Sequence, residues 1–350
     1  MTERVLSARQ LNHALLARQL LLGRSKSPLV KALEQIAGLQ TQYAPSAYIG
    51  LWTRLDGFRR EMLTKALEEK RAVQATLMRV TIHVVSKRDF FLFAAGVRNA
   101  RRQWWLRAQK KALGNLDMDA VAGKVQKFLA DGPRRAPELQ EFLRKEGFPP
   151  IAFSGAGLWV DLVRVPPSGT WERRRADLLG LADWWLGPSK ATEDEGLKHV
   201  VRRYLGGFGP ASLDDIAGWA GLSPTTLRPV VLRLKLSRFR DERGGELFDL
   251  PGAPLPNPDT PAPVRFLPTW DANLLVHARR TQILPERYRP LIFTTKNPQS
   301  LGTFLVDGAV AGGWTYEKGR VHLWPFARLS RAVRKQLDDE ADRLAAFQTS

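Results

Sequence analysis

The 350-residue chain contains no cysteine and only five histidines. The absence of thiols excludes disulfides, thiolate zinc sites and a cysteine nucleophile. The histidines show no ligand spacing, and the acidic residues are scattered along helices rather than paired on a short strand or turn. We therefore expect a protein without a metal or any other cofactor. The acidic cluster from Thr192 to Gly196 is expected to cap the helix that follows it rather than to bind a metal.

Several functional motifs are also missing. The chain has no P-loop, no G-x-G-x-x-G, no G-x-S-x-G elbow and no H-E-x-x-H, which argues against a nucleotide hydrolase and a metal nuclease. Its first 20 residues are charged and contain no uninterrupted apolar run, so they are predicted to be neither a signal peptide nor a membrane span. The expected location is the cytoplasm, without a membrane partner.

Positive charge is what the chain has in excess. It carries 54 Lys and Arg against 35 Asp and Glu, a formal net charge of +19 with a pI near 10.6. Such a balance favours a polyanionic partner, first nucleic acid and second an anionic membrane surface, although a high-GC genome would account for part of the excess. The hydrophobic fraction of 44% can fill a sizeable core, and the length suggests two or three domains.

The N-terminal part of the chain changes its hydrophobic period once. Apolar residues recur at helical spacing through the first 70 residues, including a helix start at Ser27 and Pro28. From Ala75 to Ser86 they alternate with polar ones, which predicts a half-buried strand with Arg79 and His83 on its polar, positively charged face. Helices followed by a basic strand are the outline of a winged-helix unit.

This outline occurs twice more. A helix pair between residues 118 and 147 precedes a helix around 157–165 and a Pro-Gly turn that leads into Arg173, Arg174 and Arg175. From Leu213 to Leu234 two helices flank a short turn at Gly221, as in helix-turn-helix motifs, and a hairpin around Gly244 follows. The helix-turn-helix can serve as a DNA recognition element or purely as scaffold. Three such units suggest tandem winged-helix modules.

The C-terminal part reads as a separate small domain. Residues 251–266 are Pro-rich and are expected to form an extended linker. Strand patterns between 304 and 326 enclose an Asp307-Gly308 turn, and an amphipathic helix ends the chain. We therefore expect an α+β, C-shaped protein with three tandem winged-helix modules and a C-terminal small β-barrel with a closing helix. The expected domains are residues 1–112, 113–197, 198–257 and 258–350.

Two arginine clusters are candidates for DNA contact. The run from Arg173 to Arg175 lies at a predicted wing, where phosphate contact is favoured over a merely solvated face. Arg279 and Arg280 either contact DNA or are polar residues at a strand end. The basic segment 98–111, by contrast, is expected to be an amphipathic helix whose tryptophans enter the core rather than stack on bases.

Gln40 and Gln42 stand two residues apart just before a proline. On extended chain their side chains would point the same way, and on a helix they would diverge. An amide can donate and accept hydrogen bonds but cannot act as a general acid or base. The pair could hold a water, a base edge or a sugar, but the local sequence alone favours solvated residues at a helix end.

Five segments in order extend this interpretation: 38–55, 79–85, 165–186, 266–285 and 305–315. Together they resemble the AlkZ-like (YcaQ/AlkZ) family of bacterial winged-helix DNA glycosylases, over about residues 5–347. The resemblance implies three winged helices and a β-barrel around duplex DNA in a basic channel. It implies excision of bulky or N7-alkylated purines, unhooking of interstrand crosslinks by some members, and self-resistance in producers of DNA-alkylating antibiotics.

The family's Gln-x-Gln catalytic motif falls on Gln40 and Gln42, with Thr41 where an aliphatic or aromatic residue is usual. An N7-alkylated purine is cationic, so its glycosidic bond needs little acid catalysis, and what remains is to place a water and stabilise the sugar cation. Without a catalytic lysine we expect a monofunctional hydrolase that spares unmodified purines and acts as a monomer. The alternatives are a non-catalytic winged-helix regulator or adduct-shielding protein and, less favoured, an RNA-binding protein.

Overall fold

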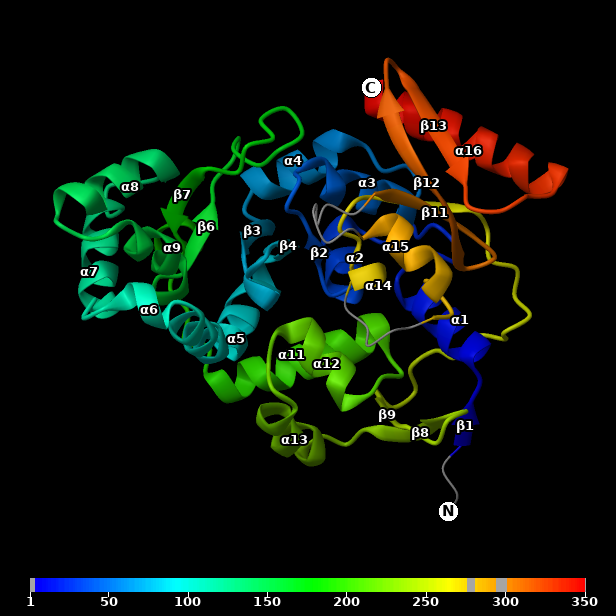
Figure 1. Cartoon of the computed structure of the whole chain (residues 1–350), viewed down its shortest axis with the longest axis horizontal. Helices are drawn as coiled ribbons and strands as arrows, with labels where there is room; N and C mark the ends of the chain where they lie inside the picture. The colour runs from blue at the N-terminus through cyan, green and yellow to red at the C-terminus, as the bar shows by residue number, and fades with distance from the viewer. Residues whose placement is uncertain (1–3, 276–280, 294–300, 350) are drawn as a thin grey trace.

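The computed structural model describes residues 4–275, 281–293 and 301–349. It is a mixed α+β protein. Figure 1 shows the helices α6–α9 at one end of the long axis and the strands β11–β13 with helix α16 at the other, while helices α11–α13 lie below the centre. Within the described ranges, no helix is both long and apolar enough to cross a membrane.

The first unit consists of four short helices and a strand hairpin. Ser7 begins the first helix by accepting a hydrogen bond from the backbone N–H of Gln10, while the Ser7 backbone N–H donates to Gln10 Oε1. The helices are α1 (Ala8–Arg18), α2 (Leu29–Gln35), α3 (Pro45–Arg54) and α4 (Arg60–Glu68). The strands are β2 (Leu39–Gln40), β3 (Ala72–Thr76) and β4 (Ile82–Ser86), and the long helix α5 (Lys87–Ala108) follows.

The predicted single strand from Ala75 to Ser86 is wrong, because the segment turns back on itself. β3 and β4 pair antiparallel, with Thr76 opposite Ile82, across the 3₁₀ turn η1 (Met78–Val80). Arg79 and Val80 both have positive φ, +52° and +58°. Positive φ is uncommon outside glycine, so an alternating apolar pattern with neither Gly nor Asn gives no sign of the turn.

The second unit continues the sheet of the first. Its helices are α6 (Lys110–Leu113), α7 (Met118–Phe128), α8 (Ala136–Lys145), α9 (Pro150–Trp159) and α10 (Ala182–Leu186), and its strands are β5 (Arg134–Arg135), β6 (Leu162–Arg164) and β7 (Leu178–Leu181). β3 pairs antiparallel with β6, so the order in one six-stranded sheet is β2-β4-β3-β6-β7-β5. The helix predicted around 157–165 is only partly correct, since α9 ends at Trp159 and β6 follows. The amphipathic helix predicted for 98–111 lies mostly in α5, with Trp105 buried and Trp104 exposed.

The third unit matches the predicted helix-turn-helix and hairpin. Its elements are α11 (Glu193–Phe208), α12 (Leu213–Ala220), α13 (Pro224–Arg233), β8 (Ser237–Asp241) and β9 (Glu246–Asp249). Gly221 ends α12 in the left-handed conformation, and Thr192 caps α11 through a capping box with Glu195. The first strand of the chain, β1 (Arg4–Leu6), pairs parallel with β8.

Two of the long helices cross without side chains between them. Gly96 of α5 and Gly196 of α11 face each other so closely that a Cβ on Gly96 would lie 2.6 Å from the Gly196 carbonyl carbon. Since only glycine allows this approach, the pair fixes the third unit against the helix that connects the first two.

The C-terminal part is a sheet and not the expected barrel. β10 (Arg265–Leu267), β11 (Gly302–Val306), β12 (Ala309–Glu317) and β13 (Arg320–Pro325) form an antiparallel sheet in that order. In the part of the chain that is described, β10 and β13 remain its two edges and do not pair to close it, and α16 (Arg331–Thr349) packs against β13. The short helices α14 (Ala272–Leu275), η2 (Glu286–Tyr288) and α15 (Arg289–Ile292) lie between β10 and β11.

Candidate functional site

The glutamine pair lies on extended chain, not at a helix end. α2 stops at Gln35, and the chain turns through Ala37 and Gly38, both with positive φ, before it enters β2. Gly38 is required at this turn, because a Cβ there would come within 2.9 Å of a backbone oxygen of β4. The backbone N–H of Thr41 donates to Ile82 O (2.8 Å) and extends the ladder beyond Gln40. The divergence expected on a helix does not arise.

Both glutamine amides are held by the turn between β3 and β4. Gln40 Oε1 accepts a hydrogen bond from Arg79 Nη2, and Gln42 Oε1 accepts one from the backbone N–H of Ile82, each at 2.6 Å. Because a guanidinium and a peptide N–H can only donate, the orientation of each amide is chemically determined. The amide NH₂ groups are therefore the donors left for a ligand. Gln40 is buried and Gln42 is exposed.

Arg79 connects the glutamine pair to the third unit. Its Nη1 donates to Trp219 O (2.6 Å) near the C-terminal end of α12, where helix carbonyls favour a cation. Gly221 packs against the Arg79 backbone, with only 3.1 Å between the position of its missing Cβ and Arg79 Cα. Burial lowers the pKa of Arg79 to about 10, so the side chain stays charged at neutral pH. Arg79 is thus largely buried, and it holds the Gln40 amide in place through its hydrogen bond to Oε1.

His83, predicted on the DNA-facing side of a strand, is buried in β4 opposite Gln40. Its Nδ1 is 3.0 Å from Thr81 O. Burial and the nearby Arg79 charge lower its pKa to about 3, which leaves the ring neutral. A buried neutral ring suits a structural role and offers no charge for a phosphate contact.

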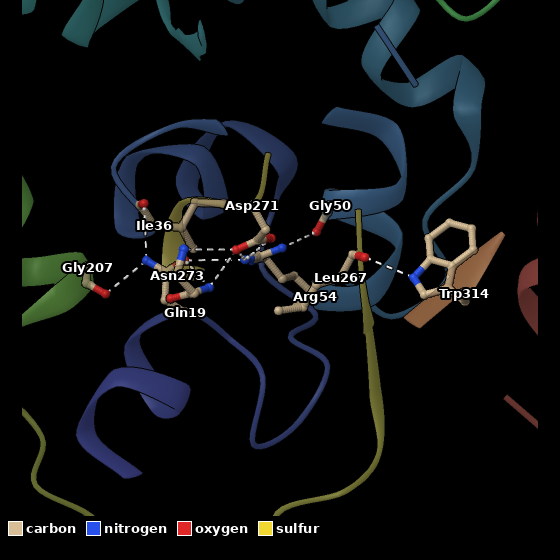
Figure 2. A network of polar contacts seen from close by, with 9 residues as sticks. All are labelled: Gln19, Ile36, Gly50, Arg54, Gly207, Leu267, Asp271, Asn273 and Trp314. Atoms are coloured by element: carbon tan, nitrogen blue, oxygen red, sulfur yellow. Dashed lines mark hydrogen bonds and ion pairs between the residues drawn. The ribbon is translucent and has the colours of Figure 1, made fainter. Parts of the chain in front are cut away.

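A buried polar network supports the turn that leads into β2 (Figure 2). Gln19, at the end of α1, donates through Nε2 to Ile36 O (3.2 Å) and to Gly207 O of α11 (2.9 Å). Its Oε1 faces the ion pair of Arg54 and Asp271, whose side chains have no exposed surface. The Gln19 side chain therefore connects α1 with α11 and with Ile36, two residues before Gly38.

The ion pair links α3 to the C-terminal part. Arg54 Nη2 donates to Asp271 Oδ2 at 2.9 Å, and Arg54 Nη1 donates to Gly50 O. Asn273 donates from Nδ2 to Asp271 Oδ1. Sequence reasoning missed these residues, because a buried polar side chain and a surface one look alike in a single sequence.

The predicted arginine run lies in the loop between β6 and β7. Arg173, Arg174 and Arg175 are all exposed, and Arg174 Nη1 donates to Tyr43 Oη (2.8 Å), next to Gln42. The loop is anchored by Trp171, which is buried against Tyr48 of α3 and Phe347 of α16. The structure thus brings this cluster to the glutamine segment. Arg279 and Arg280 lie outside the described residues.

A metal site was not expected. Among the residues that the structure describes, no three or more His, Cys, Asp or Glu side chains gather closely enough to hold an ion. What the site offers instead is amide and guanidinium donors.

Comparison with known proteins places the chain in a family. The model of the family described as "DNA glycosylase AlkZ-like" matches residues 33–347. The chain belongs to the AlkZ-like DNA glycosylase family. Its fold is similar to that of the Streptomyces sahachiroi DNA glycosylase AlkZ, with a TM-score of 0.82, 19% sequence identity, and coverage of 99% of this chain and 97% of that one. No curated protein matches the chain. Membership makes DNA the substrate and base excision in DNA repair the activity class of this AlkZ-like chain.

Proposed function

We propose that this AlkZ-like chain is a monofunctional glycosylase that hydrolyses the N-glycosidic bond of bulky or N7-alkylated purines in duplex DNA. The observation that carries the proposal is the fixed pair of Gln40 and Gln42 amides on extended chain, beside the exposed Arg173–Arg175 loop. The three helix-hairpin units are the winged helices of this proposal. The proposal also includes a C-shaped molecule that acts as a cytoplasmic monomer. It further includes unhooking of crosslinks and self-resistance to a DNA-alkylating product.

The proposed reaction needs little proton transfer on the base. As the bond between C1′ and N9 breaks, its electron pair goes to the cationic purine, which leaves neutral, while a water forms the new bond to C1′ and loses its proton to solvent. Gln40 and Gln42 cannot take that proton. Their NH₂ groups, and the second lone pairs of their carbonyl oxygens, can hold the water or a sugar oxygen in place.

The arginine loop supplies the proposed DNA contacts. Exposed guanidinium groups pair with phosphates and release counterions, so affinity should fall steeply with salt. Arg174 donates a hydrogen bond to Tyr43, one residue after Gln42. A phosphate bound by Arg174 would therefore lie close to the glutamine segment. In this proposal Arg79 supports Gln40, and the contribution of Arg279 and Arg280 to DNA binding remains a prediction.

The test is release of base from a duplex that carries N7-methylguanine, followed by alkaline cleavage at the resulting abasic site. Gln40→Ala and Gln42→Ala should each lower the single-turnover rate about 100-fold or more, as loss of a transition-state donor does. Gln103→Ala, an exposed glutamine of α5, is the matched control and should act like wild type. Undiminished release by both site variants would refute the proposed role of the pair.

A second candidate function rests on α13. Its exposed Thr225, Thr226 and Arg228 could contact base edges, as expected of a DNA-binding regulator or an adduct-shielding protein. Sequence-specific footprinting without any base release would favour this function. Base release from alkylated duplex of unrelated sequences would exclude it as the main activity.

A further inference from the structure

A pocket opens beside Gln42, between the hairpin turn of the first unit and the helices of the second. Its volume is about 310 Å³, at the lower end of the range usual for small ligands. Its walls are mainly apolar, and they come from β4, α8, α9 and the neighbouring turn. The main apolar side chains that line it are those of Val80, Ile82, Leu139, Phe153, Ala156 and Leu158.

Most polar side chains of this pocket are donors, and only Ser154, whose hydroxyl donates to Ile151 O, offers an acceptor alone. Arg164 of β6 donates from Nη1 to Thr76 Oγ1 (3.2 Å), which leaves the Thr76 hydroxyl hydrogen free to donate. Arg164 Nε is buried and has no partner in the structure. Gln42 also lines the pocket, and its free NH₂ group donates because its oxygen is already bound by Ile82 N–H.

The charge of Arg164 is not balanced locally. No carboxylate within the described ranges forms an ion pair with it, and burial lowers its pKa to about 10, so it remains a cation at neutral pH. Leaving a cation partly desolvated without a counter-charge costs stability. A planar ligand with several acceptor atoms would recover part of that cost by accepting from the guanidinium.

We propose that this pocket receives the departing purine, an uncharged aromatic base whose ring nitrogens and carbonyl oxygen accept hydrogen bonds from Arg164, Thr76 and Gln42. The inference rests on the proposed function, and it identifies where the base that leaves in that reaction is bound. The bond between C1′ and N9 breaks with its electrons going to the purine, so the base enters the pocket neutral while the positive charge develops on the sugar.

This direction of charge transfer suits a fixed cation. Before the bond breaks, the alkylated purine is positively charged and is repelled by Arg164. As the electron pair moves onto the purine, that repulsion disappears. The ring nitrogens and carbonyl oxygen of the purine then become better hydrogen-bond acceptors for Arg164. An interaction that improves only during bond cleavage lowers the barrier rather than merely tightening binding. Arg164 would therefore act mainly on kcat.

Gly157 offers a way to fill the pocket without disturbing the fold. It lies on α9, lines the pocket, and a Cβ at this position would meet nothing closer than 3.8 Å. Gly157→Met places a flexible apolar chain there and improves the helix propensity at the same time. The matched control is Gly123→Met, on the exposed face of α7, where a Cβ would also meet nothing.

The experiment measures single-turnover base release from duplexes carrying N7-methylguanine or a bulkier aromatic N7 adduct, with thermal unfolding as a check on folding. Gly157→Met should slow release of both bases at least tenfold, while Gly123→Met acts like wild type. Arg164→Gln should lower kcat more than it changes KM, and Arg164→Lys, which keeps the charge, should recover part of the loss.

The outcomes separate this inference from the proposed function. A wild-type protein that releases no base refutes the proposed function itself. An active wild type whose Gly157→Met variant releases both bases as fast as Gly123→Met overturns the pocket assignment alone. Slower release of only the bulky adduct also overturns it, because the pocket would then hold the substituent and not the purine.

Discussion

At the residue scale, the site depends on which groups are charged and which are neutral. Arg79 stays a cation although it is largely buried, because Gln40 Oε1 and Trp219 O solvate it. His83, four residues further along, is kept neutral by burial and by that cation. The Gln40 amide is therefore oriented by a fixed charge, while its partner in the strand pairing, His83, carries none.

The lowered pKa of His83 predicts a pH dependence of stability. The unfolded chain takes up a proton near pH 6.5 and the folded one only near pH 3, so the unfolded state gains protons as the pH falls between these values. Between pH 7 and pH 4 this single group should reduce the free energy of unfolding by about 3 kcal/mol.

Urea denaturation of wild type and of His83→Gln at both pH values measures this contribution. The variant should lose less stability on acidification than wild type, because its side chain does not titrate. An equal loss in the two proteins would show that His83 is protonated in the folded state.

Some of these residues could be predicted from sequence and others could not. Ser212 and Gly221 mark the ends of α12 through local chemistry, so the helix-turn-helix was predictable. The left-handed backbone at Arg79 depends on packing against Gly221, which is distant in sequence. Gln40 and Gln42 were found through a resemblance, since their geometry depends on a hairpin that the alternating pattern concealed.

At the element scale, close backbone contacts decide how helices pack. α9 shows the contrast within three residues, because a Cβ on Gly155 would come within 2.7 Å of the Trp105 ring whereas one on Gly157 would meet nothing closer than 3.8 Å. Of two glycines on one helix, one is therefore required by packing and the other would tolerate a side chain. Sequence composition cannot distinguish them.

The crossing of α5 and α11 gives a quantitative prediction. Gly96→Ala forces the helices apart at the Gly196 backbone and should lower the free energy of unfolding by about 1–3 kcal/mol, the usual cost of overpacking. Gly218→Ala, on the exposed face of α12 where a Cβ meets nothing, should be neutral or stabilising. Chemical denaturation of the two variants tests this, and equal stability would mean that the helices separate without cost.

At the scale of the whole molecule, buried ion pairs join parts that are distant in the chain. Arg18 of α1 binds Asp249 of β9 through two hydrogen bonds, at 2.6 and 2.8 Å, and Arg54 of α3 binds Asp271 beyond the Pro-rich segment. The first unit is thus connected to both the third unit and the C-terminal part. The segment 251–266, predicted to be an extended linker, has neither helix nor strand from Pro251 to Val264, but its last two residues lie in β10.

Breaking one of these pairs should be costly. Arg54→Met leaves Asp271 buried without its partner, and we expect a loss of about 3–5 kcal/mol in the free energy of unfolding. The double variant Arg54→Met, Asp271→Leu should recover much of the loss. Arg9→Met removes an exposed ion pair with Asp307 and should change stability little. A similar loss in the single and double variants would indicate that packing rather than charge is responsible.

The pairing of β3 with β6 has a consequence for how the enzyme meets a damaged duplex. The turn that holds the glutamines and the loop that carries the three arginines emerge from strands of the same ladder. The register of β3 against β6 fixes the strand ends from which these two segments leave the sheet. In the proposed complex, the lesion and its flanking phosphates would therefore meet protein groups that are carried by one continuous sheet.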